Sequence, residues 1–129
     1  MEKYSRKVRY YECDAMGVMH HSNYIRVMEE ARIDYLDRIG YNFAKLGAEG
    51  IVSPVVSLNC RYLKPARFDD VVETEVRIVS MTSLKLTLSY EMTVAGTVVF
   101  TAESVHCFFE NGRPITIPER FPLLSGNLA

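Results

Sequence analysis

The sequence predicts an α+β protein in which one long helix packs against an antiparallel β-sheet of about five strands. Two patterns lead to this prediction. Between Ser22 and Ile39 the apolar residues recur every three or four positions, which is typical of an amphipathic helix. After Gly50 apolar and polar residues alternate with the period of a strand, and the connections are short enough for hairpins. No repeat, low-complexity segment or linker divides the chain, so we expect one domain over residues 1–129.

The first strand and the long helix are expected in the N-terminal third of the chain. Lys3–Tyr11 is interpreted as a strand, and Ser22–Ile39 as the helix. Ser22 or Asn23 can accept the free N–H groups at the start of this helix. Gly40 can adopt the left-handed conformation that ends it. The helix boundaries are therefore predicted from both its pattern and its flanking residues.

The rest of the chain is predicted to form a short helical turn over residues 43–46 and then strands. Ile51–Tyr62 alternates as a strand, and Pro54, which has no backbone donor, belongs near its end or at a sheet edge. Three further runs, starting at Val71, Leu84 and Thr97, predict an antiparallel meander, and the last is apolar on both faces, as in a central strand. The turn Asn111-Gly112 closes that strand. One helix covers one face of such a sheet, so we expect self-association to protect the remaining face and an edge strand.

The charge balance and the cysteines exclude several classes of protein. The chain has 15 Lys and Arg against 16 Asp and Glu, and this net charge of −1 gives no electrostatic indication of binding to nucleic acid or an anionic membrane. No apolar run approaches the ~18 residues of a membrane span, and the charged N-terminus does not fit a secretory signal. The three cysteines are widely spaced without a CxxC pair, which argues against disulfides and a thiolate zinc site. Free thiols favour a reducing, cytoplasmic location.

Residues 10–24, YYECDAMGVMHHSNY, gather tyrosines, carboxylates, a glycine and a histidine pair just before the helix. Asp14 lies in this segment, near a helix N-terminus whose backbone N–H groups lack partners and which carries about half a positive charge. Such an end can stabilise a carbonyl oxygen that becomes negative, and a nearby carboxylate can attack the carbonyl or take a proton from water. The residues alone leave a second interpretation open, in which Asp14 only closes an Asx-turn in a loop.

This segment resembles the active-site segment of hotdog-fold acyl-CoA thioesterases of the YbgC and 4-hydroxybenzoyl-CoA thioesterase type. The residues that match the family pattern are Tyr10, Asp14, Gly17, His21 and Tyr24. A second match is RYLKPARFDD, residues 61–70, which is similar to the family's segment before its second hairpin. The resemblance covers essentially the whole chain. Cys13 departs from it, because YbgC-like members usually carry Thr there, and His21 is similar to YbgC rather than to 4-hydroxybenzoyl-CoA thioesterase.

The resemblance implies a hotdog fold and hydrolysis of a short-chain or aromatic acyl-CoA, without a metal or other cofactor. Asp14 would act as nucleophile or general base, while a backbone N–H near His21 polarises the thioester carbonyl. His21 and Tyr10 are the other expected catalytic residues, and Gly17, Val18 and Tyr24 are expected to bind the substrate. Arg61 and Lys64 are added to the substrate-binding residues because their charges suit the CoA phosphates, while the residues alone leave a role in surface solubility open. Two subunits of this family join their sheets, so a homodimer or homotetramer is expected. An acyl carrier protein, instead of CoA, remains an alternative carrier of the acyl group.

Two other functions remain open. A hotdog hydratase or dehydratase would pair its Asp with a His in a loop containing Asn-Pro, which the segment Asp14-Ala-Met-Gly lacks. A non-catalytic acyl-thioester binding module would gain little from a carboxylate held beside a thioester carbonyl. Of the other conspicuous residues, His20 and His106 are expected to be hydrogen-bonded rather than metal ligands. Glu30 is expected to be a solvated helix charge, and Cys13 is not expected to be a nucleophile, because Asp14 beside it raises its thiol pKa.

Overall fold

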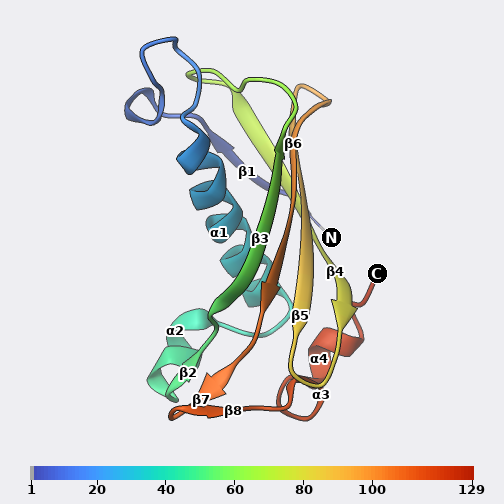
Figure 1. Cartoon of the computed structure of the whole chain (residues 1–129). Helices are drawn as coiled ribbons and strands as arrows, with labels where there is room; N and C mark the ends of the chain where they lie inside the picture. Colours follow the sequence, from blue (N-terminus) through green and yellow to red (C-terminus); the bar gives the residue numbers. More distant parts are fainter. Residues whose placement is uncertain (1) are drawn as a thin grey trace.

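The computed structural model describes residues 2–129 and contains a five-stranded antiparallel sheet with the long helix α1 (His21–Arg38) across one face (Figure 1). The strands of this sheet are β1 (Tyr4–Lys7), β3 (Val55–Tyr62), β4 (Val71–Met81), β5 (Leu86–Val94) and β6 (Thr97–His106). They are ordered β1-β4-β5-β6-β3, so β1 and β3 are the edges and the predicted meander of β4, β5 and β6 lies between them. The α+β prediction is confirmed.

Small elements lie at the lower end of the sheet in Figure 1, opposite the loops that precede α1. They are the helices α2 (Phe43–Ala48), α3 (Ile117–Arg120) and α4 (Pro122–Ser125), and the strands β2 (Ile51–Val52), β7 (Phe109–Glu110) and β8 (Arg113–Pro114). The three short strands form a second sheet in the order β2-β7-β8. Within residues 2–129, no helix has both the length and the apolar character that crossing a membrane requires.

The long helix forms where the sequence predicts it, but its start differs in detail. Its N-cap is His20, whose imidazole accepts the Ser22 N–H at 3.2 Å, so the expected cap by Ser22 or Asn23 is wrong. Asn23 lies inside the first turn of the helix, and its side-chain amide donates to the Glu12 C=O at 2.8 Å. Gly40 has a φ of +110° and lies just beyond the helix end, as predicted.

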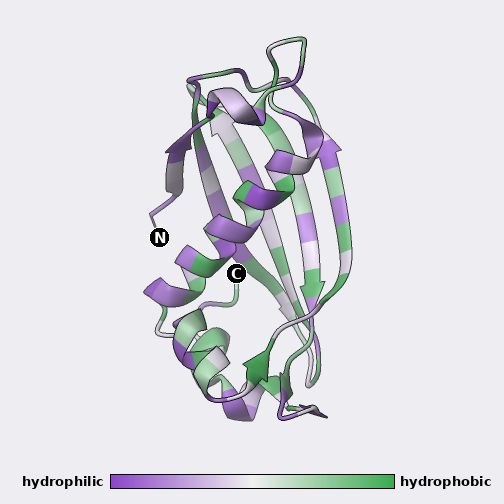
Figure 2. Ribbon diagram, turned by 90° about the vertical axis from the view of Figure 1, so that its left-hand side faces the viewer, coloured by the Kyte–Doolittle hydropathy of each residue, from purple (hydrophilic) through white to green (hydrophobic). Residues whose placement is uncertain are grey.

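The core lies between α1 and the inner face of the sheet. The helix buries one apolar stripe, made up of Tyr24, Val27, Met28, Ala31, Tyr35 and Leu36. Alternate residues of β4 and β5 are buried beneath it, namely Val72, Thr74, Val76, Ile78, Leu86, Leu88, Tyr90 and Met92. Figure 2 shows the resulting alternation of hydrophilic and hydrophobic bands along the central strands. The predicted period of two is therefore confirmed for both strands.

The first strand is shorter than predicted. β1 ends at Lys7, and Tyr10–Glu12 form a 3-10 turn instead of extending the strand to Tyr11. The Arg9 N–H donates to the Glu12 carboxylate at 2.8 Å, which gives the backbone a local partner in place of a ladder bond. The strand propensity of two adjacent tyrosines is overridden by this bond.

The predicted strand Ile51–Tyr62 is interrupted at Ser53 and Pro54, so that β2 and β3 belong to different sheets. β3 lies at the edge of the main sheet, as Pro54 indicated. Several of its apolar side chains are exposed, namely Val55, Val56, Leu58 and Tyr62. β6 is an interior strand, as predicted, and it runs from Thr97 to His106. The protomer therefore leaves an apolar edge strand uncovered.

Candidate active site

Asp14 lies in a tight turn between β1 and α1. Its carboxylate Oδ1 accepts the Met16 N–H at 2.8 Å and the Val18 N–H at 3.5 Å, and its own N–H donates to the Val18 C=O at 2.9 Å. Gly17, with a φ of +76°, supplies the left-handed residue of the turn. Oδ2 has no hydrogen-bond partner within residues 2–129. Asp14 therefore does close an Asx-turn, yet one carboxylate oxygen remains free to act on a ligand.

The start of α1 presents a free backbone donor. The imidazole of His20 accepts the Ser22 N–H at 3.2 Å, and the His20 C=O accepts the Asn23 N–H at 2.9 Å. In the described part of the chain, the His21 N–H has no hydrogen-bond partner. Because a helix N-terminus is partially positive, this N–H can stabilise an oxygen that gains negative charge. The exposed His21 ring stacks on His20, with 4.1 Å between the ring centroids.

A second loop, between β3 and β4, supports the turn that holds Asp14. The two loops lie side by side at the top of Figure 1. The Met19 N–H donates to the Ala66 C=O at 2.7 Å, and the Ala66 N–H donates to the Tyr24 hydroxyl at 2.9 Å. Tyr24 is only 3% exposed, and burial raises its phenol pKa, so it stays protonated at neutral pH. Tyr24 thus joins α1 to this loop from within the core.

Aromatic rings surround the first turn of α1. The Tyr62 hydroxyl donates to the His21 C=O at 2.9 Å, and its ring makes an edge-to-face contact with Tyr24 at 5.1 Å. Phe100 completes the group, 5.0 Å from Tyr62 and 5.1 Å from Tyr24. Tyr62 was not predicted as a site residue, although it is the second residue of RYLKPARFDD and stands at an inward position of β3. These rings hold the helix start on the sheet.

The structure brings together only part of the predicted site. One turn and the adjoining helix start contain Asp14, Gly17, Val18 and His21, with Tyr24 buried beneath them. These residues share one end of the sheet because the Asp14 turn leads directly into α1. A carboxylate oxygen and a helix N-terminus at this end can act on a carbonyl group together.

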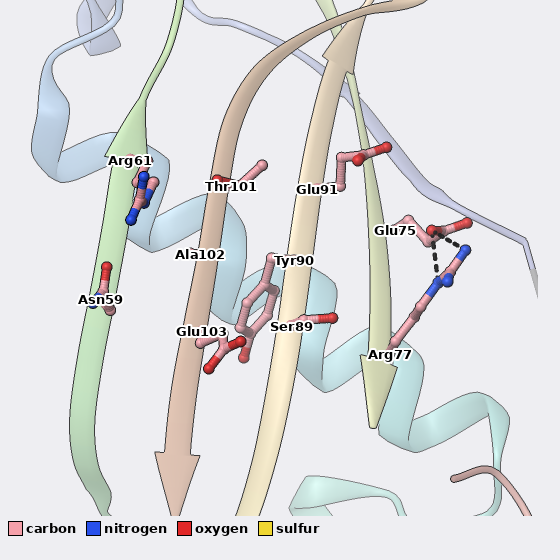
Figure 3. Close-up of a pocket in the computed structure, with 10 residues that line it drawn as sticks. All are labelled: Asn59, Arg61, Glu75, Arg77, Ser89, Tyr90, Glu91, Thr101, Ala102 and Glu103. Carbon is pink, nitrogen blue, oxygen red and sulfur yellow. Dashed lines mark hydrogen bonds and ion pairs between the residues drawn. The ribbon is translucent and has the colours of Figure 1, made fainter. Parts of the chain in front are cut away.

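Three predicted residues lie apart from this group in the protomer. Tyr10 is 78% exposed, and its ring packs against Phe68, with the centroids 5.4 Å apart, rather than against Asp14. Arg61 lies on the outer face of β3, because the neighbouring Tyr62 faces α1. Figure 3 shows Arg61 there, in a shallow polar concavity of about 510 Å³. Lys64 is exposed beyond the end of β3.

A buried ion pair next to Asp14 was missed by the sequence analysis. Arg6 donates to both carboxylate oxygens of Glu12, at 2.7 and 2.6 Å, and this pairing lowers the Glu12 pKa. Arg6 also donates to Glu30 at 3.0 Å, and the Tyr4 hydroxyl reaches the same oxygen at 2.7 Å. The expectation of a solvated Glu30 holds only in part, because its side chain is 38% exposed but is bound by Tyr4 and Arg6 of β1. One sequence signal was present, since Arg6 alternates with Tyr4 on the inward face of the first strand.

Two further residues, His106 and Cys13, have the surroundings that the sequence analysis predicts for them. His106 is 1% exposed, and its Nε2 lies 2.7 Å from the Ser104 hydroxyl, as expected of a hydrogen-bonded sheet histidine. Burial raises the pKa of the Cys13 thiol, and the charges of Glu12 and Asp14 raise it further, which disfavours a thiolate. Among residues 2–129, no three His, Cys, Asp or Glu side chains are grouped closely enough to hold a metal ion.

Comparisons with known proteins agree with this geometry. The family model described as thioesterase-like superfamily matches residues 8–122. The crystal structure of hypothetical protein TT1821 from Thermus thermophilus has a TM-score of 0.93 at 34% identity, covering 98% of this chain and 99% of that chain. DHNA-CoA thioesterase from Staphylococcus aureus has a TM-score of 0.89 at 28% identity, covering 98% and 87%. Acyl-CoA thioester hydrolase YbgC of Escherichia coli is 34% identical over 80 residues, which are 62% of this chain and 60% of that protein.

Proposed function

Because this chain belongs to the thioesterase-like superfamily and has the hotdog fold, we propose that it hydrolyses the thioester of a short-chain or aromatic acyl-CoA. The products are a carboxylic acid and the free thiol of CoA. Two of the similar proteins, YbgC and the DHNA-CoA thioesterase, are named for the hydrolysis of CoA thioesters, which supports CoA as the carrier. An acyl carrier protein is the alternative carrier.

The observation that carries the proposal is the pairing of a held carboxylate with a free helix N-terminus. Asp14 Oδ1 is fixed by two backbone N–H groups, which leaves Oδ2 for the reaction. The His21 N–H would donate to the thioester carbonyl oxygen and stabilise the negative charge that develops there, an effect worth about 2.7–4 kcal/mol per donor in acyl-transfer enzymes. A non-catalytic pocket would gain little from the free Oδ2 of this carboxylate beside a thioester carbonyl.

Asp14 can act by either of two routes. As a general base it takes a proton from water, the resulting hydroxide adds to the carbonyl carbon, and the C–S bond breaks as the thiolate leaves. As a nucleophile its Oδ2 displaces the thiolate to form an anhydride, which water then hydrolyses. Both routes leave CoA as a thiolate, whose parent thiol has a pKa of ~8.5 and needs little assistance from an acid.

The other residues are assigned supporting roles in this proposal. The exposed imidazole of His21 would orient the attacking water or the substrate, and Gly17 and Val18 would line the thioester. Lys64 would contact the CoA phosphates. Arg61 lies on the outer face of the sheet, so it would reach the same phosphates only if CoA passed around the open edge of β3. Tyr10, which projects from the turn, would meet the acyl group or a second subunit.

We further propose that the enzyme is a homodimer or homotetramer. β3 leaves one side of its backbone unpaired and exposes apolar residues, with Val56 at 49% and Leu58 at 40% exposed. Pairing with β3 of a second copy would continue the sheet and cover these side chains. A cytoplasmic location is part of the same proposal, and the three free cysteines support it.

The test is thiol release from a panel of acyl-CoAs, from short aliphatic through benzoyl to long-chain, by the parent protein and Asp14→Asn. Saturable release with at least one acyl group, reduced about a hundredfold or more by Asp14→Asn, is expected, since a positioned base contributes ~10²–10⁴-fold. Asp37→Asn is the matched control, because Asp37 is an exposed carboxylate at the far end of α1. Binding of acyl-CoA without turnover by the parent would instead favour the non-catalytic binding module.

A further inference from the structure

A buried ion pair lies immediately before the Asp14 turn. The Arg6 guanidinium donates to both carboxylate oxygens of Glu12, at 2.7 and 2.6 Å, and the two side chains are only 8% and 5% exposed. The Arg9 N–H donates to the same carboxylate at 2.8 Å. Parallel hydrogen bonds of this kind fix the orientation of a carboxylate as well as its position. Glu12 therefore cannot shift without breaking several buried contacts.

The main chain of Glu12 is joined to the helix on the other side of the turn. Its C=O accepts the His20 N–H at 2.9 Å and the Asn23 side-chain amide at 2.8 Å. Arg6, in turn, donates through Nε to Glu30 of α1 at 3.0 Å. The pair thus connects β1 and the first turns of α1 at the two ends of the segment that contains Asp14.

Stability alone explains this arrangement poorly. Burying two charges costs desolvation energy that can exceed their attraction, and apolar replacement of both partners is often neutral or stabilising. A bidentate Arg–carboxylate pair, in contrast, fixes both the distance and the angle between the guanidinium and the carboxylate. Because Asp14 is only two residues beyond Glu12, a shift of Glu12 would be transmitted directly to the Asp14 carboxylate.

We infer that Arg6 and Glu12 are positioning residues that hold the Asp14 carboxylate in place relative to the His21 N–H. The inference rests on the proposed hydrolysis, in which both groups act on one thioester. Arg6 and Glu12 do not touch the substrate, since their side chains are buried against each other. A misplacement of about 1 Å can slow such a reaction ~10²-fold. Loss of the pair should therefore lower kcat much more than it changes KM.

Two single variants disturb the pair in different ways. Glu12→Gln keeps the shape of the side chain but removes its charge, and Arg6→Lys keeps the charge but removes the planar fork. Each should lower kcat by roughly tenfold or more and change KM by less than about threefold. Asp34→Asn is the matched control, because it breaks the 3.0 Å ion pair with Arg38 on α1 and should leave kcat within about twofold. An unchanged kcat in both single variants would overturn the inference.

The decisive comparison repeats Glu12→Gln in an Asp14→Asn background. Residues that act through one another have non-additive effects, so Glu12→Gln should lower the remaining hydrolysis by less than about twofold there. An equal tenfold loss in both backgrounds would contradict a positioning role and indicate a general structural effect. If Glu12→Gln does not fold, Arg6→Lys is taken through the same cycle, and the double variant R6M/E12L, which replaces the pair by apolar side chains, should fold yet remain slow.

Hydrogen exchange provides a readout that does not depend on turnover. The Met16 and Val18 N–H groups, which bind Asp14 Oδ1, should exchange faster in Glu12→Gln and unchanged in Asp34→Asn. Parent-like exchange in Glu12→Gln would overturn the inference. The two proposals fail in different ways: a fully active Asp14→Asn refutes the proposed function, whereas an inactive Asp14→Asn with a fully active Glu12→Gln refutes only the positioning role.

Discussion

Replacing Tyr24 by Phe separates a structural role from a substrate-binding role. The Tyr24 hydroxyl accepts the Ala66 N–H at 2.9 Å, and Ala66 is fully buried. Tyr24→Phe removes a single oxygen and keeps the ring that packs against Tyr62 and Phe100. The variant therefore leaves the Ala66 N–H buried without a partner, while the aromatic packing stays intact.

The expected loss of stability follows from that unpaired donor. A buried donor without an acceptor costs about 1–3 kcal/mol. For a chain of 129 residues each kcal/mol corresponds to roughly 3–6 °C in Tm. Tyr24→Phe should therefore lower Tm by about 3–18 °C. Because Tyr24 is 3% exposed, KM for acyl-CoA should change less than about threefold at temperatures where the variant is folded.

Urea unfolding and thermal melting of parent and variant measure this effect, and KM is measured on the same samples. Tyr35→Phe is the matched control, since Tyr35 is a buried tyrosine of the same helix, 7% exposed, without a hydrogen bond to any residue from 2 to 129. The control should lose less than about 0.5 kcal/mol. A Tyr24→Phe variant with parental stability and a strongly raised KM would refute the structural reasoning and favour the substrate-binding role expected from the family resemblance.

Three further predictions concern pH and assembly. Burial and the nearby Arg32 charge lower the His106 pKa from 6.5 to about 4. Between these two pH values the unfolded state binds a proton that the folded state does not, so the free energy of unfolding falls by up to about 3 kcal/mol as pH drops from 6.5 to 4. Urea unfolding of His106→Gln at pH 7, 5 and 4 should lack this slope, and a slope equal to the parent's would contradict the assignment. Arg6 lowers the Glu12 pKa, so the contribution of the pair to the free energy of unfolding is complete above the ordinary pKa of 4.5 and is lost as pH falls through the lower pKa of the folded state. In Glu12→Gln the free energy of unfolding should therefore depend less steeply on pH than in the parent, but only below pH 4.5. Leu58→Lys puts a charge on the exposed edge strand and should shift the sedimentation coefficient toward the monomer, whereas an unchanged oligomer would exclude β3 as the contact.

The parts of the fold with a clear period could be predicted from the sequence. The helix from His21 to Arg38 and the buried faces of β4 and β5 are visible as apolar residues that recur every 3.6 and every 2 positions. Burial of one face of a helix or strand imposes this spacing on the sequence directly. The end of β1 could not be predicted in this way, because the Glu12 carboxylate captures the Arg9 N–H and turns the chain. The His20 cap was also missed, because sequence patterns assign helix starts to Ser, Thr, Asp or Asn, whereas here an imidazole accepts the Ser22 N–H.

The candidate site was predictable where it depends on adjacent residues. Asp14, Gly17 and His21 lie close in sequence, and the turn and helix start keep them close in space. Tyr10 was included by resemblance and Arg61 for its charge, and both lie apart from Asp14 in the protomer. Strand alternation places Arg61 on the outer face of β3, and the Tyr10 ring packs against Phe68. The pairing of Arg6 with Glu12 depends on how β1 meets the loop, which no periodic pattern encodes.

The central claim is that the Asp14 carboxylate performs the chemical step. The most direct measurement is the single-turnover rate of thiol release, with enzyme in excess over an acyl-CoA that the parent hydrolyses, for the parent and Asp14→Asn. When the enzyme concentration is also well above the Kd of each variant, the substrate is fully bound and the rate reports chemistry rather than affinity. A rate at least about a hundredfold lower in Asp14→Asn, with acyl-CoA still bound, is the expected result. A variant that releases thiol at the parental rate would contradict the claim.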